Sequence, residues 1–226
     1  MDKIIDLFDR KLSPIASKIS GQRHLIAIRD GLILTMPLMI VGSIVIIFST
    51  DFPIPGWADF ITGIFPTWDD FIWGVVFQST MSLAALIAVM GITYSLVNSY
   101  KEEGIVAAVL AVSAFFLLQD GSAWAWNSSA LGAEGLFLGI IVAMIVSEIY
   151  VRIVKGNFVI RLPESVPVAI SRSFVALVPG AFVIILFAII HVLFRMTPYG
   201  TAGAFIVAVL QAPLVTISAS YIGAML

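Results

Sequence analysis

The twelve Lys and Arg residues of this 226-residue chain are distributed in a way that leaves few folds open. Six of them precede the first long apolar stretch: Lys3, Arg10, Lys11, Lys18, Arg23 and Arg29. Apart from Arg195, the others fall in every second loop between apolar segments: Lys101, Arg152, Lys155, Arg161 and Arg172. The loops at 51–70 and 119–134 contain none. Because Lys and Arg concentrate in the cytoplasmic loops of membrane proteins, the pattern predicts a chain that crosses a bilayer repeatedly, with its N-terminus in the cytoplasm.

The composition supports a membrane protein and excludes several other classes. Hydrophobic residues make up 60% of the chain and charged residues only 12%, whereas a soluble domain carries roughly a quarter charged residues. The net charge of −2 is too small to predict a nucleic-acid partner. The absence of Cys excludes disulfides, thiolate metal sites and a cysteine nucleophile. With only two His residues, no metal or other cofactor is expected.

Apolar windows of about 20 residues predict the membrane crossings. They fall at 31–50, 71–97, 104–118, 135–151 and 173–194. These segments are continuously apolar, whereas the strands of a membrane barrel alternate, so the spans are predicted to be helical. The fold class expected is an all-α polytopic integral membrane protein with five full spans. The window at 104–118 is short, so its helix either extends through Gln119 towards Trp126 or is shielded by neighbouring helices.

The two ends of the chain are expected to lie at the membrane surface. Residues 2–19 place five apolar side chains on one helical face: Ile4, Phe8, Leu12, Ile15 and Ile19. Such a basic amphipathic helix is typical of an anchor on the anionic leaflet, or of a docking surface for a cytoplasmic partner. Residues 200–211 fit a short outer amphipathic helix, with a sixth crossing starting at Leu214. The alternative is one long kinked span over 200–226. In either case the chain stops within apolar sequence, so we expect it to be truncated.

The fourth apolar segment carries a small residue at every fourth position, at Gly135, Gly139, Ala143 and Ser147. Small residues let two helices approach closely, and such packing drives helix association in lipid. The sequence therefore predicts a helix-packing face here, either within one protomer or across a homodimer, and leaves both possibilities open.

Few residues in the spans carry reactive groups. Glu148 is predicted to pair with Arg152 four residues on. His191 has only Arg195 nearby and His24 lies beside Arg23, so both histidines are interpreted as structural rather than catalytic. Polar residues also gather in the second span, where they suit interhelical hydrogen bonds or a sugar-binding wall: Gln78, Ser79, Thr80, Ser82, Thr93, Tyr94 and Ser95. Five tryptophans predict an aromatic belt on the outer face, although Trp also stacks on sugars: Trp57, Trp68, Trp73, Trp124 and Trp126.

Three stretches of sequence resemble one known family. They are QRHLIAIRDGLILTMPLMIVGS at 22–43, LPESVPVAISRSFVALVPG ending at Gly180, and QAPLVTISAS at 211–220. Together with the amphipathic N-terminus they resemble the membrane IIC component of bacterial phosphoenolpyruvate-dependent sugar phosphotransferase systems. The branch that they are most similar to is the lactose, cellobiose and diacetylchitobiose branch. The resemblance extends over the whole chain.

The resemblance implies a function and a domain organisation. Members import a sugar, often a disaccharide, through the bacterial inner membrane and deliver it to a cytoplasmic phosphorylated IIB partner. Each protomer of the homodimer resembles a ten-span protein, in which the first five spans form a scaffold. By resemblance, 1–30 is a cytoplasmic amphipathic segment, 31–198 the scaffold and dimerisation domain, and 199–226 an outer connector with the start of the next span.

The chain resembles only the N-terminal half of this family. The family's key His, in a WFFGIHG-like run, and a later Glu both lie downstream of the matched part, so no catalytic or sugar-contacting residue is assigned here. The fragment alone is expected to dimerise but not to transport. Two alternatives remain: a complete small membrane protein that scaffolds or regulates a partner, and an unrelated facilitator or channel. The spans lack the charged ring that many ion filters use.

Overall fold

The computed structural model describes residues 21–119, 121–122, 125–126, 128–163 and 165–211. The predicted helix at 2–19 and the sixth crossing from Leu214 therefore lie outside the described residues. The helices are α3 (Arg23–Ile33), α4 (Met36–Ile47), α5 (Trp57–Ile64), α6 (Gln78–Thr80), α7 (Ala84–Ser99), α8 (Gly104–Leu117), α9 (Ser128–Leu131), α10 (Leu136–Lys155), α11 (Val168–Val175), α12 (Leu177–Arg195) and α13 (Ala202–Ile206). Irregular helical turns are η2 (Asp70–Phe77), η3 (Met81–Leu83), η4 (Ala133–Gly135) and η5 (Val207–Gln211), and a two-residue hairpin pairs β1 (Gly121–Ser122) with β2 (Ala125–Trp126).

Within the residues that the structure describes, four helical segments are long and apolar enough to cross a membrane. They are Arg23–Ile47, Asp70–Ser99, Ala133–Lys155 and Ile170–Arg195, and α8 is a shorter apolar helix. The all-α membrane class is thereby confirmed at the level of four candidate spans and one shorter helix. The extension of α8 towards Trp126 is wrong, because the chain turns after Leu118 into the β1–β2 hairpin.

The first span begins at Arg23 rather than at residue 31, and it is broken near its middle. α3 ends at Ile33 and α4 begins at Met36. Pro37 lies in the first turn of α4. Proline has no backbone N–H to continue the helical ladder and clashes with the preceding turn, so a helix breaks just before it. The apolar window concealed this break because every residue around Pro37 is suited to lipid.

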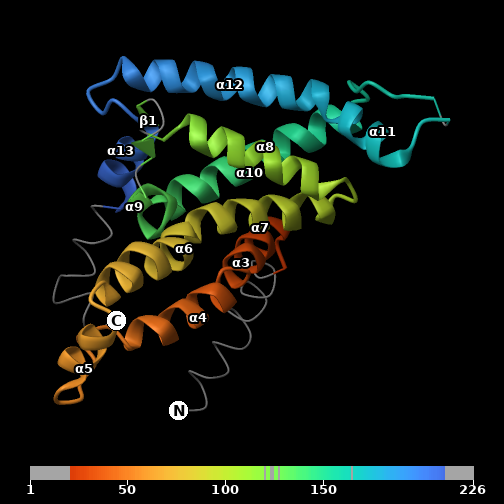
Figure 1. Cartoon of the computed structure of the whole chain (residues 1–226). Coiled ribbons are helices and arrows are strands. Elements are labelled where there is room, and N and C mark those ends of the chain that lie inside the picture. Colours follow the sequence, from red (N-terminus) through yellow and green to blue (C-terminus); the bar gives the residue numbers. More distant parts are fainter. Residues whose placement is uncertain (1–20, 120, 123–124, 127, 164, 212–226) are drawn as a thin grey trace, which may run out of the picture.

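The second span is also interrupted. η2 is π-helical, and a short 3-10 turn, η3, separates it from α7. The hydroxyl of Thr80 donates a 2.6 Å hydrogen bond to the carbonyl of Val76, a local bond that bends helices. Gly42 of α4 packs against this point, where an added Cβ would lie 2.4 Å from the Thr80 hydroxyl. α4 and the η2–α6 half of the second span therefore stay together as they diverge from the other helices (Figure 1).

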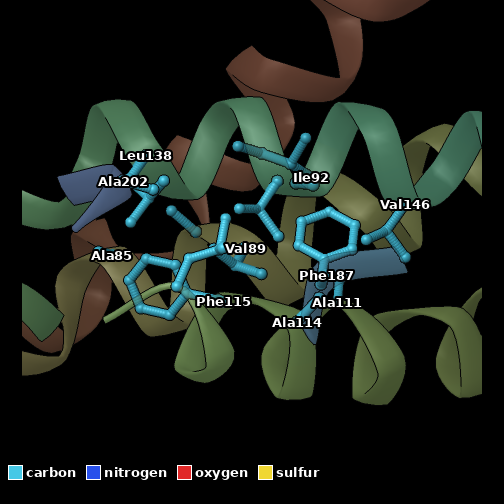
Figure 2. Close-up of a cluster of buried hydrophobic side chains, with 14 of the residues drawn as sticks. Ala85, Val89, Ile92, Ala111, Ala114, Phe115, Leu138, Val146, Phe187 and Ala202 are labelled. Atoms are coloured by element: carbon cyan, nitrogen blue, oxygen red, sulfur yellow. The ribbon is translucent and has the colours of Figure 1, made fainter. Parts of the chain in front are cut away.

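The core is built around α7. This helix contacts α3, α8 and α10, while α12 packs on α8 and α10 (Figure 1). Figure 2 shows why the helices come so close: Ala85, Ala111 and Ala114 leave room for the larger Phe115 and Phe187, and all five side chains are buried. Small residues at helix crossings allow this close van der Waals packing in lipid. The shielding of the short α8 by its neighbours follows from the same packing.

The basic residues gather at one end of the helical body. Arg23 at the start of α3 and Lys155 at the end of α10 both lie over the ring of Tyr100, which follows α7. Arg172 of α11 pairs with Glu103 at the start of α8, with 3.3 Å between nitrogen and oxygen. Arg195 ends α12 at the opposite end. The basic loops predicted from the sequence therefore lie at a common end of the molecule, although they are distant from one another along the chain.

Candidate functional site

The small-residue face of α10 points into the protomer. A Cβ added to Gly139 would lie 2.8 Å from the Val89 side chain of α7 and 3.7 Å from the ring of Phe115 in α8. Ala143 and Ser147 are both completely buried. The Ser147 hydroxyl donates to the carbonyl of Ala143 at 2.6 Å and so is satisfied within its own helix. In this geometry the face meets α7 and α8 of the same chain.

An open cleft of about 680 Å³ lies between α4 with the end of α3, the second span and the start of α10. Its lining is mainly apolar, with Met39, Trp73 and Phe77 among its walls. Its polar groups are Thr35, Ser43, Gln78, Ser82 and Glu134. The Thr35 hydroxyl already donates to the carbonyl of Leu32 in α3, and the Ser43 hydroxyl donates to the carbonyl of Ile40 within α4. Because a sugar needs many hydrogen-bond partners, this lining suits an apolar occupant better than a sugar.

The polar residues of the second span do not form one wall. Gln78 and Ser82 face the cleft, whereas Thr80 is turned towards Gly42 of α4. Thr93 is completely buried and its hydroxyl has no hydrogen-bond partner among the described residues. Ser95 donates to Asp30 of α3 at 3.3 Å. These residues point in several directions, so the sugar-binding wall is not supported in this part of the chain.

The cluster around Glu148 was only half visible in the sequence. The predicted pair is confirmed, with 3.1 Å between Arg152 and a Glu148 oxygen. The other oxygen of Glu148 contacts Nε2 of His24 at 2.9 Å and accepts a 2.5 Å hydrogen bond from the Tyr100 hydroxyl. The structure therefore gives His24 a structural partner 124 residues away. We name Glu148, His24, Tyr100 and Arg152 the Glu148 cluster.

The Glu148 cluster fixes the proton on Tyr100. The hydrogen bond to Glu148, followed by burial, raises the pKa of the Tyr100 phenol above its ordinary value of 10.0. A group whose pKa is raised by folding stabilises the folded state below its unfolded pKa, and that contribution is lost as the pH rises through the folded value. Tyr100 is therefore a hydrogen-bond donor throughout the neutral range, and it ties α7 to α10.

The predicted outer aromatics support the turn after α4. Trp57 donates from its indole nitrogen to the carbonyl of Ser49 at 2.9 Å, and Trp68 donates to Phe48 at 2.8 Å. Trp73 lines the cleft, while Trp124 and the side chain of Trp126 lie outside the described residues. An indole that is apolar in body and polar at one edge suits a membrane interface. Within the described residues, no cluster of three or more His, Asp or Glu could hold a metal.

Comparison with known proteins points to one family. The family model described as "Phosphotransferase system, EIIC" matches residues 29–226. The lichenan permease IIC component of Bacillus subtilis is 35% identical, with 100% of this chain and 53% of that protein covered. The cellobiose-specific EIIC component of Geobacillus stearothermophilus is also 35% identical, over 99% of this chain and 52% of its own length.

A solved structure gives the same result. The crystal structure of ChbC, the IIC component of the N,N'-diacetylchitobiose-specific phosphotransferase system, superposes with a TM-score of 0.89 at 37% identity. The match covers 96% of this chain and 54% of ChbC. The chain thus spans about half the length of the relatives that it matches.

Proposed function

Since the chain belongs to the EIIC family of phosphotransferase-system sugar permeases, a family of multi-pass bacterial membrane proteins, we propose that it is the N-terminal scaffold part of a permease for a β-linked disaccharide. The observation that carries the proposal is the match to a diacetylchitobiose IIC structure over 96% of this chain. Relatives named for cellobiose and lactose support the same substrate class. The sugar would be phosphorylated by a cytoplasmic IIB partner as it is imported.

In this proposal residues 31–198 form a five-span scaffold, and the short helix α8 is its third crossing. Residues 1–30 lie on the cytoplasmic side, and 199–226 connect to the transport part. The gathering of Arg23, Lys155 and Arg172 at one end supports a cytoplasmic location for that end. We further propose that the scaffold forms a homodimer. Light scattering during size-exclusion chromatography of the purified chain tests this, and a monomeric mass would contradict it.

The function is tested with right-side-out membrane vesicles containing the whole protein. Vesicles loaded with phosphorylated IIB are expected to accumulate phosphorylated cellobiose or diacetylchitobiose added from outside, because IIB meets the sugar only on the cytoplasmic side. Vesicles loaded with unphosphorylated IIB are the control. Product formed when phosphorylated IIB is present only outside would reverse the proposed orientation. Accumulation of unmodified sugar with either loading would contradict a phosphotransferase role.

We propose that the small-residue face of α10 holds the protomer together rather than joining two protomers. In the native Cys-free chain, an Ala143→Cys or Ser147→Cys variant is then expected to give no inter-protomer disulfide and little labelling by a membrane-permeable maleimide, because both positions are buried. The control for access of the reagent is Lys155→Cys, at the exposed polar end of the same helix, which should label readily. A disulfide-linked dimer through position 143 or 147 would place this face at the dimer interface.

A further inference from the structure

Two cationic side chains from distant segments meet at one aromatic ring. The guanidinium carbon of Arg23, in α3, lies 4.5 Å from the centre of the Tyr100 ring, and the ammonium of Lys155, in α10, lies 5.1 Å from it. We call these three residues the Tyr100 site. Among the described residues, no carboxylate lies within ion-pairing distance of Arg23 or Lys155. Cation–π contacts at exposed positions are weak, and Arg and Lys carry five and three N–H donors, so both cations keep donors available although Arg23 also interacts with the Tyr100 hydroxyl.

The surroundings of the Tyr100 site leave an excess of positive charge. Glu148 is the carboxylate that contacts Tyr100, but it is already engaged by Tyr100, His24 and Arg152. Among the side chains that contact Tyr100 directly or through Glu148, there is one carboxylate, Glu148, and there are three permanent cations: Arg23, Arg152 and Lys155. The Tyr100 hydroxyl is held by its 2.5 Å bond to Glu148, which fixes the ring over which the cations lie. The site is therefore a positioned pair of cations on a rigid support.

The depth of the Tyr100 site indicates what it meets in a membrane. Arg23 begins one candidate span, Lys155 ends another, and Tyr100 directly follows a third that ends at Ser99. All three lie where apolar sequence gives way to polar sequence, which is the level of the lipid headgroups. Basic pockets between transmembrane helices bind anionic headgroups, and Arg and Lys both bind phosphate well.

We propose that Arg23 and Lys155, arranged around Tyr100, bind the phosphate of an anionic phospholipid headgroup. The bound lipid would link the start of α3 to the end of α10, and its negative charge would neutralise part of the positive charge at the Tyr100 site. The proposal requires only that the chain spans a membrane, and it does not depend on which sugar is carried. Failure of the sugar-phosphorylation experiment would leave it intact, and its own failure would leave the permease function intact.

The test uses native mass spectrometry of the whole protein, exchanged from nanodiscs of phosphatidylcholine containing phosphatidylglycerol. Wild type is expected to retain a phosphatidylglycerol adduct in preference to phosphatidylcholine. The double variant Arg23→Gln/Lys155→Gln should bind it about thirtyfold more weakly, since each cation near a headgroup contributes about fivefold to affinity. Lys155→Gln alone, at an exposed position, should lose about fivefold by the same estimate.

Two controls separate the site from general surface charge. Arg161→Gln removes an exposed cation from the following loop and should retain the adduct, while the charge-preserving variant Arg23→Lys/Lys155→Arg should retain most of it. Equal binding by wild type and the double glutamine variant would overturn the proposal, and so would equal losses in the Arg161 variant. Displacement of the lipid by millimolar inorganic phosphate would also overturn it, because the site would then be one for free phosphate.

Discussion

Substitution of Gly31 by Ala is expected to destabilise the protein by about 3 kcal/mol, at the upper end of the usual cost of overpacking. The first and second spans cross at this residue with almost no space between their backbones. A Cβ at Gly31 would lie 2.3 Å from the Ile92 side chain and 2.5 Å from the Ile92 backbone nitrogen. A side chain can rotate away, but a backbone nitrogen within α7 moves only if the helix moves. The measurement is the thermal midpoint in detergent, followed by fluorescence-detected size-exclusion chromatography.

A matched control separates this clash from the general effect of adding a methyl group. Gly63 is also helical, in α5, and an added Cβ there meets nothing within 4 Å. Gly63→Ala should be neutral or stabilising by about 0.5–1 kcal/mol, because Gly is intrinsically unfavourable in a helix. An unchanged midpoint for Gly31→Ala would show that α3 and α7 are not held in backbone contact.

The Gly31 crossing shows what a single sequence reveals about packing and what it conceals. The periodic small residues of α10 were visible because they recur within one helix. The partner of Gly31 is Gly91, whose own added Cβ would lie 2.9 Å from the Gly31 Cα. These two glycines are far apart in the chain and neither belongs to a repeat. Which glycine of one span meets which glycine of another depends on tertiary packing.

The membrane spans also have features that the sequence reveals and others that it conceals. Hydropathy located all five apolar helical segments, because a helix must satisfy its backbone groups wherever lipid surrounds it. It missed the breaks at Pro37 and Thr80, since neither interrupts the apolar character of its window. It also began the first span too late, because Arg23, His24 and Arg29 are polar but lie in α3 all the same. The partner of His24 is Glu148, 124 residues away, which a hydropathy window at the start of the chain does not contain.

The family was predictable from the sequence, and the substrate-handling chemistry was not. The resemblance carried by residues 22–43 and the segment ending at Gly180 is confirmed by the EIIC match over 29–226. The alternative of an unrelated facilitator or channel is wrong for the same reason. Within this chain, sequence reasoning found the Glu148–Arg152 pair because its members are one helical turn apart. It missed His24 and Tyr100, which complete the Glu148 cluster from two other segments.

Replacement of Glu148 by Gln is the second large effect that we expect, with a loss of roughly 2–3 kcal/mol in the free energy of unfolding. The physical reason is that Glu148 accepts from Tyr100 at 2.5 Å and contacts His24 at 2.9 Å, with only 22% of its side chain exposed. Hydrogen bonds to a charged group contribute about 1.5–3 kcal/mol each. Glutamine keeps the size of the side chain but weakens both bonds.

Substitution of the partners of Glu148 should cost less stability the more exposed the partner is. Arg152 is 74% exposed, so Arg152→Gln is expected to cost less than about 1 kcal/mol. Tyr100→Phe removes one buried bond to a carboxylate and should fall between the two, at about 1.5 kcal/mol. Asp51→Asn, at an exposed position of the opposite end, is the control and should be neutral. The thermal midpoint of each variant gives the ranking.

A double-mutant cycle decides whether the Glu148 cluster acts as a unit. If His24 and Tyr100 stabilise the fold through Glu148, the combined variant Glu148→Gln/Tyr100→Phe should lose less than the sum of the two single losses, because the second change removes a bond that the first has already weakened. Strict additivity would mean that the Tyr100 hydroxyl contributes to stability independently of Glu148. A cost for Arg152→Gln equal to that of Glu148→Gln would instead assign the stability to the exposed ion pair. Since Glu148 contacts residues at the start of α3 and after the end of α7, coupling between Glu148 and Tyr100 would mean that this carboxylate helps to hold α7 against α10 at the basic end of the molecule.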